Sequence, residues 1–260
     1  MSSFVESMFS LSGKVAVVLG GTSGIGQAIA RGYAKAGATV IASSRRADMV
    51  EAEAAELEKL GSKTIRQTAD VMDRGSLESL RDATVAAFGG VDIMVCTSGM
   101  WAKYPSAEYP EAEFTKLIDC NVNGSFRADQ IFGAQMIAQG RGGAIINIAS
   151  LTSFVAFNQV TAYATSKAAV VMLTKQLASE WAPHNIRVNA IAPGVFRTPL
   201  NSAALDIPER AAGIIAKTPM GRFGQLEELV GLAIYFAAPA GQFCTGQIVA
   251  VDGGFLAKGV

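Results

Sequence analysis

Two side chains with acid–base chemistry stand four residues apart in the segment Tyr163-Ala-Thr-Ser-Lys167. If this segment is helical, the phenol of Tyr163 and the ammonium of Lys167 share one face. None of the other four tyrosines has a lysine at that spacing. A phenol beside a cation is suited to proton transfer to or from a substrate oxygen. Such a pair also arises by chance, so the neighbouring residues must support it.

Two further polar residues are predicted to reach the same place. Ser150 lies thirteen residues before Tyr163 and directly follows the apolar run 144–149, which we predict to be a strand. The carboxyl ends of neighbouring parallel strands open onto one crevice, which places this hydroxyl beside the helix that carries Tyr163. Asn121 lies in the long helix that we predict before that strand. The four residues predict a catalytic centre at the carboxyl edge of a sheet.

A glycine-rich turn, Gly-Gly-Thr-Ser-Gly-Ile-Gly at residues 20–26, follows the first predicted strand and opens a helix. Glycines let the backbone approach a pyrophosphate, which free N–H groups at a helix N-terminus stabilise. The spacing differs from Gly-x-Gly-x-x-Gly, and glycines also build ordinary strand-to-helix turns. The residues predicted to contact a dinucleotide here are Gly20, Thr22, Ser23, Gly24, Ile25 and Gly26.

The second predicted strand runs into Ser43-Ser44-Arg45-Arg46, where the adenosine ribose of a dinucleotide is expected. A carboxylate at this position would favour NAD, and the segment has none. Small hydroxyl side chains followed by arginine suit the 2′-phosphate of NADP. We therefore predict NADP, with NAD as the alternative, and contacts from Ser44, Arg45 and Arg46. Two arginines at a solvated helix start would give the same sequence.

Asp70 and Val71 end the third predicted strand. A carboxylate there can accept from the adenine amino group, and the following backbone can close over the ring. Asp70 taken alone could equally serve as a loop or helix cap.

Short apolar runs rich in β-formers alternate with longer segments of helical period, as in repeated βαβ units. We predict one α/β domain over residues 1–260, a doubly wound parallel sheet of Rossmann type with seven strands. The strands are predicted at Lys14–Leu19, Thr39–Ala42, Thr64–Thr68, Asp92–Cys96, Ala144–Ile148, Arg187–Ala192 and Ile248–Val251. The helices are predicted near Ile25–Ala36, Met49–Leu60, Ser76–Phe88, Phe114–Ala138, Tyr163–Ala182 and Glu227–Ala237. Residues 197–222 interrupt the alternation and are predicted to cover the substrate, with an ordinary helical connection as the alternative.

Composition excludes several classes of protein. Basic and acidic residues balance at 22 each, and no basic run indicates binding to nucleic acid. The apolar runs are too short to cross a membrane, and the N-terminal residues lack the pattern of a secretory signal. The three cysteines are scattered, which argues against a disulfide framework and predicts a cytoplasmic protein. His184 is the single histidine, so we predict no metal site and no Ser-His-Asp triad.

Taken together, these motifs resemble the short-chain dehydrogenase/reductase family over nearly the whole chain. They occur in the order and at the spacing of the family, and include the stretch Arg187-Val-Asn-Ala-Ile-Ala-Pro-Gly194 followed by Thr198. The resemblance implies an enzyme that transfers a hydride between NAD(P) and an alcohol or carbonyl. The fold implied is a seven-stranded sheet, commonly assembled as a homotetramer through two long helices.

The resemblance also implies roles for the four polar residues. Tyr163 would be the general acid in reduction and the base in oxidation, with Lys167 favouring the phenolate and lowering the pKa of Tyr163. Ser150 would hydrogen-bond the substrate oxygen, and Asn121 would hold a water that links Lys167 to solvent. Lys167 would also bind the nicotinamide ribose. The further residues implied to bind the cofactor are Tyr163, Thr97, Ser98, Gly99, Pro193, Gly194, Val195 and Thr198.

Two departures from the family pattern lie beside the cofactor. The chain has Leu19 where the family usually has threonine, and Cys96-Thr97-Ser98-Gly99 where it usually has Asn-Asn-Ala-Gly. Each departure replaces a polar brace by a more apolar residue. The two changes are expected either to compensate by packing together or to loosen the cofactor site.

Within the family, the C-terminal stretch from Arg222 is most similar to sugar-acid enzymes of the gluconate and mannonate type. A sugar acid or polyol is therefore the expected small-molecule substrate, and Lys103 or Arg197 could pair with its carboxylate. Alternatives are a 3-oxoacyl thioester, a hydrophobic ketone, or a non-catalytic dinucleotide-binding sensor. The candidate substrate residues are Trp101, Lys103, Thr152, Phe157, Arg197 and Asn201.

Overall fold

The computed structural model describes residues 3–199 and 201–258. Its centre is one parallel sheet with the strand order β2-β1-β3-β4-β5-β6. The strands are β1 (Val15–Leu19), β2 (Thr39–Ser43), β3 (Ile93–Cys96), β4 (Gly143–Ile148), β5 (Ile186–Pro193) and β6 (Ile248–Val251). The chain is thus a single α/β domain of Rossmann type, as the sequence predicts.

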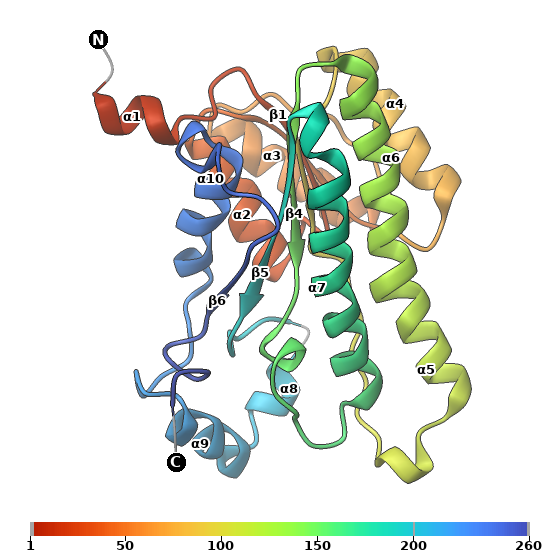
Figure 1. The fold of residues 1–260 in the computed structure, drawn as a ribbon, viewed down its shortest axis with the longest axis vertical. Coiled ribbons are helices and arrows are strands. Elements are labelled where there is room, and N and C mark those ends of the chain that lie inside the picture. Colours follow the sequence, from red (N-terminus) through yellow and green to blue (C-terminus); the bar gives the residue numbers. More distant parts are fainter. Residues whose placement is uncertain (1–2, 200, 259–260) are drawn as a thin grey trace.

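Helices cover both faces of this sheet (Figure 1). Side chains alternate along β1: Ala16 and Val18 join an apolar cluster with α2 and α10, whereas Val17 and Leu19 join another with α4, α6 and α7. This alternation follows from the period of two residues along a strand. The helices are α1 (Phe4–Phe9), α2 (Gly24–Lys35), α3 (Ala47–Lys59), α4 (Arg74–Phe88), α5 (Glu111–Ile118), α6 (Gly124–Gln139), α7 (Thr161–Trp181), α8 (Ser202–Leu205), α9 (Pro208–Lys217) and α10 (Val230–Ala237).

The predicted strand Thr64–Thr68 is wrong, and the described sheet has six strands. The segment nevertheless runs beside β2. The Val40 N–H donates to the Lys63 carbonyl at 3.1 Å, and the Ala69 N–H donates to the Ser44 carbonyl at 3.1 Å. These bonds lie at the two ends of the segment, so the residues between them form no regular ladder.

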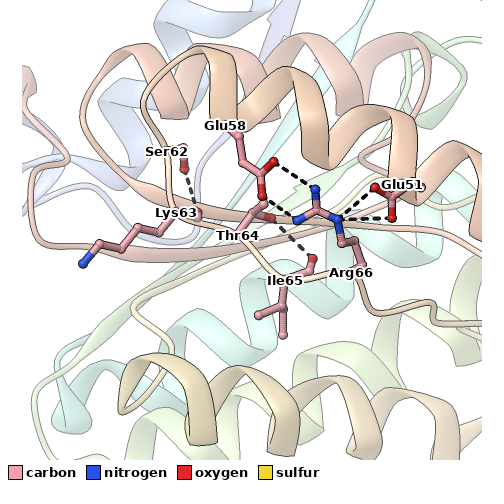
Figure 2. Close-up of polar contacts among 7 residues, drawn as sticks. All are labelled: Glu51, Glu58, Ser62, Lys63, Thr64, Ile65 and Arg66. Atoms are coloured by element: carbon pink, nitrogen blue, oxygen red, sulfur yellow. Dashed lines mark hydrogen bonds and ion pairs between the residues drawn. The ribbon is translucent and has the colours of Figure 1, made fainter.

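Side chains hold this edge segment instead (Figure 2). Figure 2 shows the Arg66 guanidinium between the carboxylates of Glu51 and Glu58 on α3, at 3.1 Å and 2.5 Å. On the inner side, the Ser43 hydroxyl donates to the Gln67 carbonyl at 2.6 Å. A segment whose residues favour β-strands can thus be held at the edge of a sheet by side-chain contacts, without pairing as a strand.

The helix predicted at Phe114–Ala138 is divided into α5 and α6 by a π-helical turn, Asp119–Asn123. Such turns insert one extra residue in a helix and often occur at functional sites. Asn121 is at the centre of this turn and is fully buried. The turn therefore displaces Asn121 from the position that a regular helix would give it.

The segment predicted to cover the substrate contains α8 and α9. Figure 1 shows both helices beyond the end of the sheet toward which β5 points. α9 buries none of its residues, so it packs only loosely on the domain. Within the described ranges, no helix has the length and apolar character needed to span a membrane.

Candidate active site

A cleft of about 480 Å³ lies along the carboxyl ends of β1, β2 and β3. It brings together residues from six separate segments of the chain. The predicted cofactor-binding residues that line it are Gly20, Thr22, Ser23, Gly24, Ile25, Gly26, Ser44, Arg45, Arg46, Asp70, Val71, Thr97, Ser98, Gly99 and Thr198. Tyr163, Lys167, Pro193, Gly194 and Val195 are not among its lining residues.

The glycine-rich turn has the geometry that its sequence predicts. Gly20 has a φ of +76°, which a residue with a side chain rarely adopts. A Cβ on Gly26 would lie 2.3 Å from the Gly20 carbonyl oxygen, so this close approach of α2 to β1 requires glycine. Ser23 caps α2 without a side-chain hydrogen bond, which leaves the N-terminal N–H groups of the helix available to an anion.

The end of β2 presents hydroxyl and guanidinium groups to the cleft. Ser44 accepts a hydrogen bond from the Thr22 hydroxyl at 2.9 Å, which links the tip of β2 to the glycine-rich turn. Arg45 and Arg46 line the cleft beside it and are both exposed. Ser43 is different, because it is buried and its hydroxyl is bonded to Gln67.

Asp70 and Val71 line the cleft. Asp70 also stabilises its own loop, which is the alternative role that the sequence allowed. Its Oδ1 accepts from the Met72 N–H at 3.0 Å, and its own N–H donates to the Ser76 hydroxyl at 3.0 Å. Asp70 therefore organises the loop that leads into α4. Val71 packs against Gly124 at the start of α6, where a Cβ would lie 2.9 Å from a Val71 methyl group.

The two departures from the family pattern lie next to each other. Leu19 and Cys96 are register partners in neighbouring strands and belong to the same buried apolar cluster. The backbone beside them is braced by Thr97, whose N–H and hydroxyl donate to the Leu19 carbonyl at 2.9 Å and 2.7 Å. Leu19 and Cys96 thus pack in one apolar cluster, and Thr97 supplies polar contacts between the two strands. This arrangement favours the alternative in which the two changes compensate for each other.

Asn121 is bonded to the backbone that follows β3. Its Oδ1 accepts from the Met100 N–H at 2.7 Å, and its Nδ2 donates to the Met100 carbonyl at 2.8 Å. Nδ2 also donates to the Ser166 hydroxyl at 2.9 Å, and Ser166 donates to the Tyr163 carbonyl at 2.7 Å. Asn121 therefore ties the loop after β3 to the helix that carries Tyr163 and Lys167.

Lys167 is buried with its ammonium held at the end of β4. Nζ donates to the Ile148 carbonyl at 2.7 Å and lies 5.8 Å from the centre of the Tyr163 ring. The position of a Cβ on Gly99 is 3.7 Å from this Nζ and 3.3 Å from Asn121 Oδ1. Burial lowers the pKa of Lys167, because the charged form loses hydration.

Ser150 lies near enough to Tyr163 to lower the pKa of its phenol, which brings the fourth predicted residue into the centre. The Ser150 hydroxyl accepts from the Thr152 N–H at 3.2 Å. Burial raises the pKa of Tyr163, and Ser150 lowers it by less. We predicted that Lys167 would lower this pKa. In the structure the lowering contribution comes from Ser150, and burial outweighs it.

The segment after β5 closes the other side of the glycine-rich turn. The Gly194 N–H donates to the Val251 carbonyl at 2.8 Å, which continues the pairing of Pro193 with Val251. Val195 follows and lines a separate cavity of about 170 Å³. Thr198 then lies over Gly24, with its Cβ 3.5 Å from the position of a Cβ there.

The predicted substrate residues differ in how they are held. Phe157 stacks on Phe255, with ring centres 5.6 Å apart. Asn201 uses its amide within its own loop: Oδ1 accepts from the Thr198 N–H at 2.9 Å, and Nδ2 donates to the Phe196 carbonyl at 2.8 Å. Thr152 has a buried hydroxyl without a partner among the described residues.

The three remaining candidates carry charge or lie beneath it. Lys103 is exposed. Arg197 forms an ion pair with Asp206 at 2.5 Å. Trp101 lies under the Arg210 guanidinium, whose carbon is 5.9 Å from the ring centre.

Sequence reasoning missed a buried polar group beneath this centre. Asp129 on α6 accepts a hydrogen bond from Asn147 Nδ2 at 3.0 Å, and Asn147 also donates to the Thr174 hydroxyl at 3.2 Å. Asp129 Oδ1 and Asn147 Oδ1 are buried without a partner among the described residues. Burial raises the pKa of Asp129 to about 7, because the charged carboxylate loses hydration. No sequence pattern marks Asp129, because its partners lie on β4 and α7.

Known proteins are similar to this chain over nearly its whole length. A family model described as enoyl-(acyl carrier protein) reductase matches residues 20–256. The chain is 37% identical over 256 residues to the 2-dehydro-3-deoxy-D-gluconate 5-dehydrogenase of Escherichia coli, covering 98% of this chain and 100% of the relative. It is 37% identical over 254 residues to the D-threitol dehydrogenase of Mycolicibacterium smegmatis, covering 98% and 97%. The crystal structure of a gluconate 5-dehydrogenase from Burkholderia cenocepacia in complex with NADP and tartrate matches with a TM-score of 0.94 at 34% identity, covering 98% of this chain and 100% of that chain.

Proposed function

The chain belongs to the short-chain dehydrogenase/reductase family, and we propose that it transfers a hydride between NADP and a sugar acid or polyol. The observation that supports this most directly is the junction made by Asn121, Ser150, Tyr163 and Lys167. These four residues, from three segments of the chain, lie at the carboxyl edge of the sheet, beside the cleft. One domain thus holds both the cofactor cleft and the catalytic centre.

In this proposal Tyr163 moves the proton. Its hydroxyl donates to the carbonyl oxygen in reduction and takes the proton from the alcohol in oxidation, while Ser150 hydrogen-bonds the same oxygen. Because burial raises the pKa of Tyr163, the protonated phenol is ready for reduction at neutral pH. Oxidation needs the phenolate, so its rate is expected to increase with pH in the alkaline range. Ser150 lowers the pKa of this phenol, Lys167 Nζ lies 5.8 Å from the centre of its ring, and Asn121 positions the helix through Ser166.

The cleft fits a dinucleotide with a 2′-phosphate. The glycine-rich turn and the free N-terminus of α2 would hold the pyrophosphate, and a nicotinamide cofactor, when bound, supplies or accepts the hydride. Ser44, Arg45 and Arg46 would hold the 2′-phosphate, since two guanidinium groups and a hydroxyl stand at the tip of β2. NADP in the structure of the related gluconate 5-dehydrogenase supports this preference.

The alternative substrates are a 3-oxoacyl thioester or a hydrophobic ketone. The description of the matching family model, an acyl carrier protein reductase, favours a thioester. The names of relatives that match nearly the whole chain at 37% identity favour sugar acids and polyols instead. These relatives carry more weight, because each is a single enzyme with a named substrate, whereas the family model describes many enzymes together.

We further propose that the protein is a cytoplasmic homotetramer built through α6 and α7. These helices lie side by side on one face of the domain (Figure 1). Phe126 on α6 and Met172 on α7 are 42% and 62% exposed, although both are large and apolar. A second copy packed on this face would bury them. Three free cysteines are consistent with a reducing compartment.

The test is an absorbance assay of NADPH and NADH with 5-keto-D-gluconate, a 3-oxoacyl thioester and a hydrophobic ketone, and of NADP and NAD with 2-dehydro-3-deoxy-D-gluconate, D-gluconate and D-threitol. Turnover of a sugar acid or polyol is expected. Turnover of the thioester or ketone alone would contradict the substrate class. Binding of the cofactor with no turnover across the panel would favour a sensor.

The cofactor preference has a separate test in direct titration. NADP is expected to bind more tightly than NAD, and Arg45→Ala should weaken NADP by about tenfold while changing NAD little, because one charge-assisted contact to the 2′-phosphate is lost. The exposed Arg74 on α4 does not line the cleft and supplies a matched control, Arg74→Ala. Equal or tighter binding of NAD by the unaltered protein would show that the tip of β2 does not select NADP.

A further inference from the structure

Residues 197–222, the predicted substrate cover, contain a cation that belongs to none of the sequence motifs. This cation lies over the loop that follows β3. Arg210 lies on α9, and its guanidinium is stacked over the indole of Trp101. Trp101 directly follows Met100, whose N–H and carbonyl are both bonded to Asn121. Because neighbouring Cα atoms are about 3.8 Å apart, Arg210 stands over the loop that Asn121 fixes at the catalytic centre.

Three cations enter this side of the molecule, and they differ in what they can still bind. Arg197 is neutralised by Asp206 at 2.5 Å. Lys103 is exposed and is a flexible point charge. Arg210 is half-buried and forms no ion pair or hydrogen bond with residues 3–199 or 201–258. Its guanidinium lies over the Trp101 ring, a contact that needs none of its N–H groups and leaves them available to a ligand.

We propose that Arg210 binds the carboxylate of the substrate and thereby selects sugar acids over uncharged polyols. This inference rests on the proposed function and assigns the acid-binding role to Arg210 rather than to Lys103 or Arg197. A planar guanidinium can bind a carboxylate through two parallel hydrogen bonds. α9 buries none of its own residues, so the bound acid adds a contact that holds the helix over the substrate.

The experiment compares an acid and a neutral substrate in one variant. Arg210→Met should raise KM for 5-keto-D-gluconate about 10- to 100-fold, the effect of losing charge-assisted hydrogen bonds, with a smaller change in kcat. The kcat/KM for D-threitol and the Kd for NADP should stay within about threefold, because neither ligand offers this carboxylate. Arg210→Lys keeps the charge but loses the paired geometry, so its KM for the acid should be intermediate.

Lys217→Met is the matched control, since it removes an exposed cation from the last turn of the same helix. It should leave KM for the acid unchanged. An equal loss with acid and polyol in Arg210→Met would show that Arg210 only supports Trp101, and would overturn the proposal. So would an unchanged KM in Arg210→Met together with a raised KM in Arg197→Met or Lys103→Met. If the unaltered protein reduces only the thioester or ketone, the proposed function fails first and independently.

Discussion

The polar groups around the cofactor cleft and those of residues 197–222, the proposed substrate cover, are held in different ways. Asn121 and Lys167 are bonded to backbone carbonyls on other elements and are buried. In the cover, Arg197 pairs with Asp206 nine residues away, and both side chains are at least half exposed. The first arrangement fixes a side chain against the sheet, whereas the second leaves it on a locally folded segment.

This difference separates the chemistry from the choice of substrate. Hydride transfer needs its proton donor and hydroxyl at defined places, which backbone bonds to a buried sheet provide. Substrate selection can be changed on a segment whose residues contribute little to the core. A cover that is held by few contacts, such as the Arg210 and Trp101 stack, can differ among relatives without disturbing the centre.

The strongest test of the fixed centre is Tyr163→Phe. Turnover should fall by about 10²- to 10⁴-fold, because the phenyl ring cannot transfer the proton, while Kd for NADP stays within a few-fold. Steady-state kinetics and cofactor titration measure both quantities. Tyr235→Phe on α10 removes a phenol elsewhere and should be neutral. Turnover retained in Tyr163→Phe would mean that another group moves the proton.

The buried polar group formed by Asp129, Asn147 and Thr174 is tested by Asp129→Asn. The folded pKa of Asp129, about 7, lies above its ordinary unfolded value near 4. The folded state therefore binds more protons than the unfolded state between these values, and stability decreases as pH rises through that range. Asparagine stays neutral and can still accept a hydrogen bond from Asn147 Nδ2 through its side-chain oxygen.

Asp129→Asn should accordingly raise the free energy of unfolding at pH 8 by roughly 2 kcal/mol and flatten its decrease between pH 4 and 7. Chemical denaturation at several pH values measures this. Asp82→Asn, which alters an exposed carboxylate on α4, should leave the slope unchanged. A variant less stable than the unaltered protein at pH 8 would show that the ionised carboxylate is stabilised.

The close approach at the glycine-rich turn is tested by Gly26→Ala. The added methyl would lie 2.3 Å from the Gly20 carbonyl oxygen and 2.4 Å from Thr97 Oγ1, so the turn must move. Overpacking of about 1–3 kcal/mol corresponds to a loss of NADP affinity of about 10- to 100-fold. Gly231→Ala on α10, where a Cβ meets nothing within 4 Å, is the control and should not weaken binding. Unchanged affinity in Gly26→Ala would mean that the turn is adaptable.

The smallest effect is expected in the cover. Asp206→Asn breaks the exposed ion pair with Arg197, which contributes less than about 1 kcal/mol in water. The melting temperature should therefore change little, as differential scanning calorimetry would show. A large decrease would indicate that the cover is as integrated as the cofactor cleft, and the contrast between the two regions would disappear.

Sequence reasoning placed the elements whose signals are local. The apolar runs of β1, β3, β4 and β5 and the glycine-rich turn were located within one or two residues. The predicted strand Thr64–Thr68 failed, because its residue types suit a strand while pairing depends on a neighbour. At that edge the Ser43 hydroxyl and the Arg66 ion pairs take the place of ladder bonds.

The sequence by itself determined the fold class and named the residues that meet at the centre. Periodicity, glycine turns and motif spacing are properties of neighbouring residues, so they can be read without coordinates. Only the tertiary structure decided which partners each side chain meets. Asn121 bonds to Met100, Asp129 lies against Asn147, and Arg210 stacks on Trp101. These contacts join segments far apart in the chain, where burial and packing rather than local pattern set the energies.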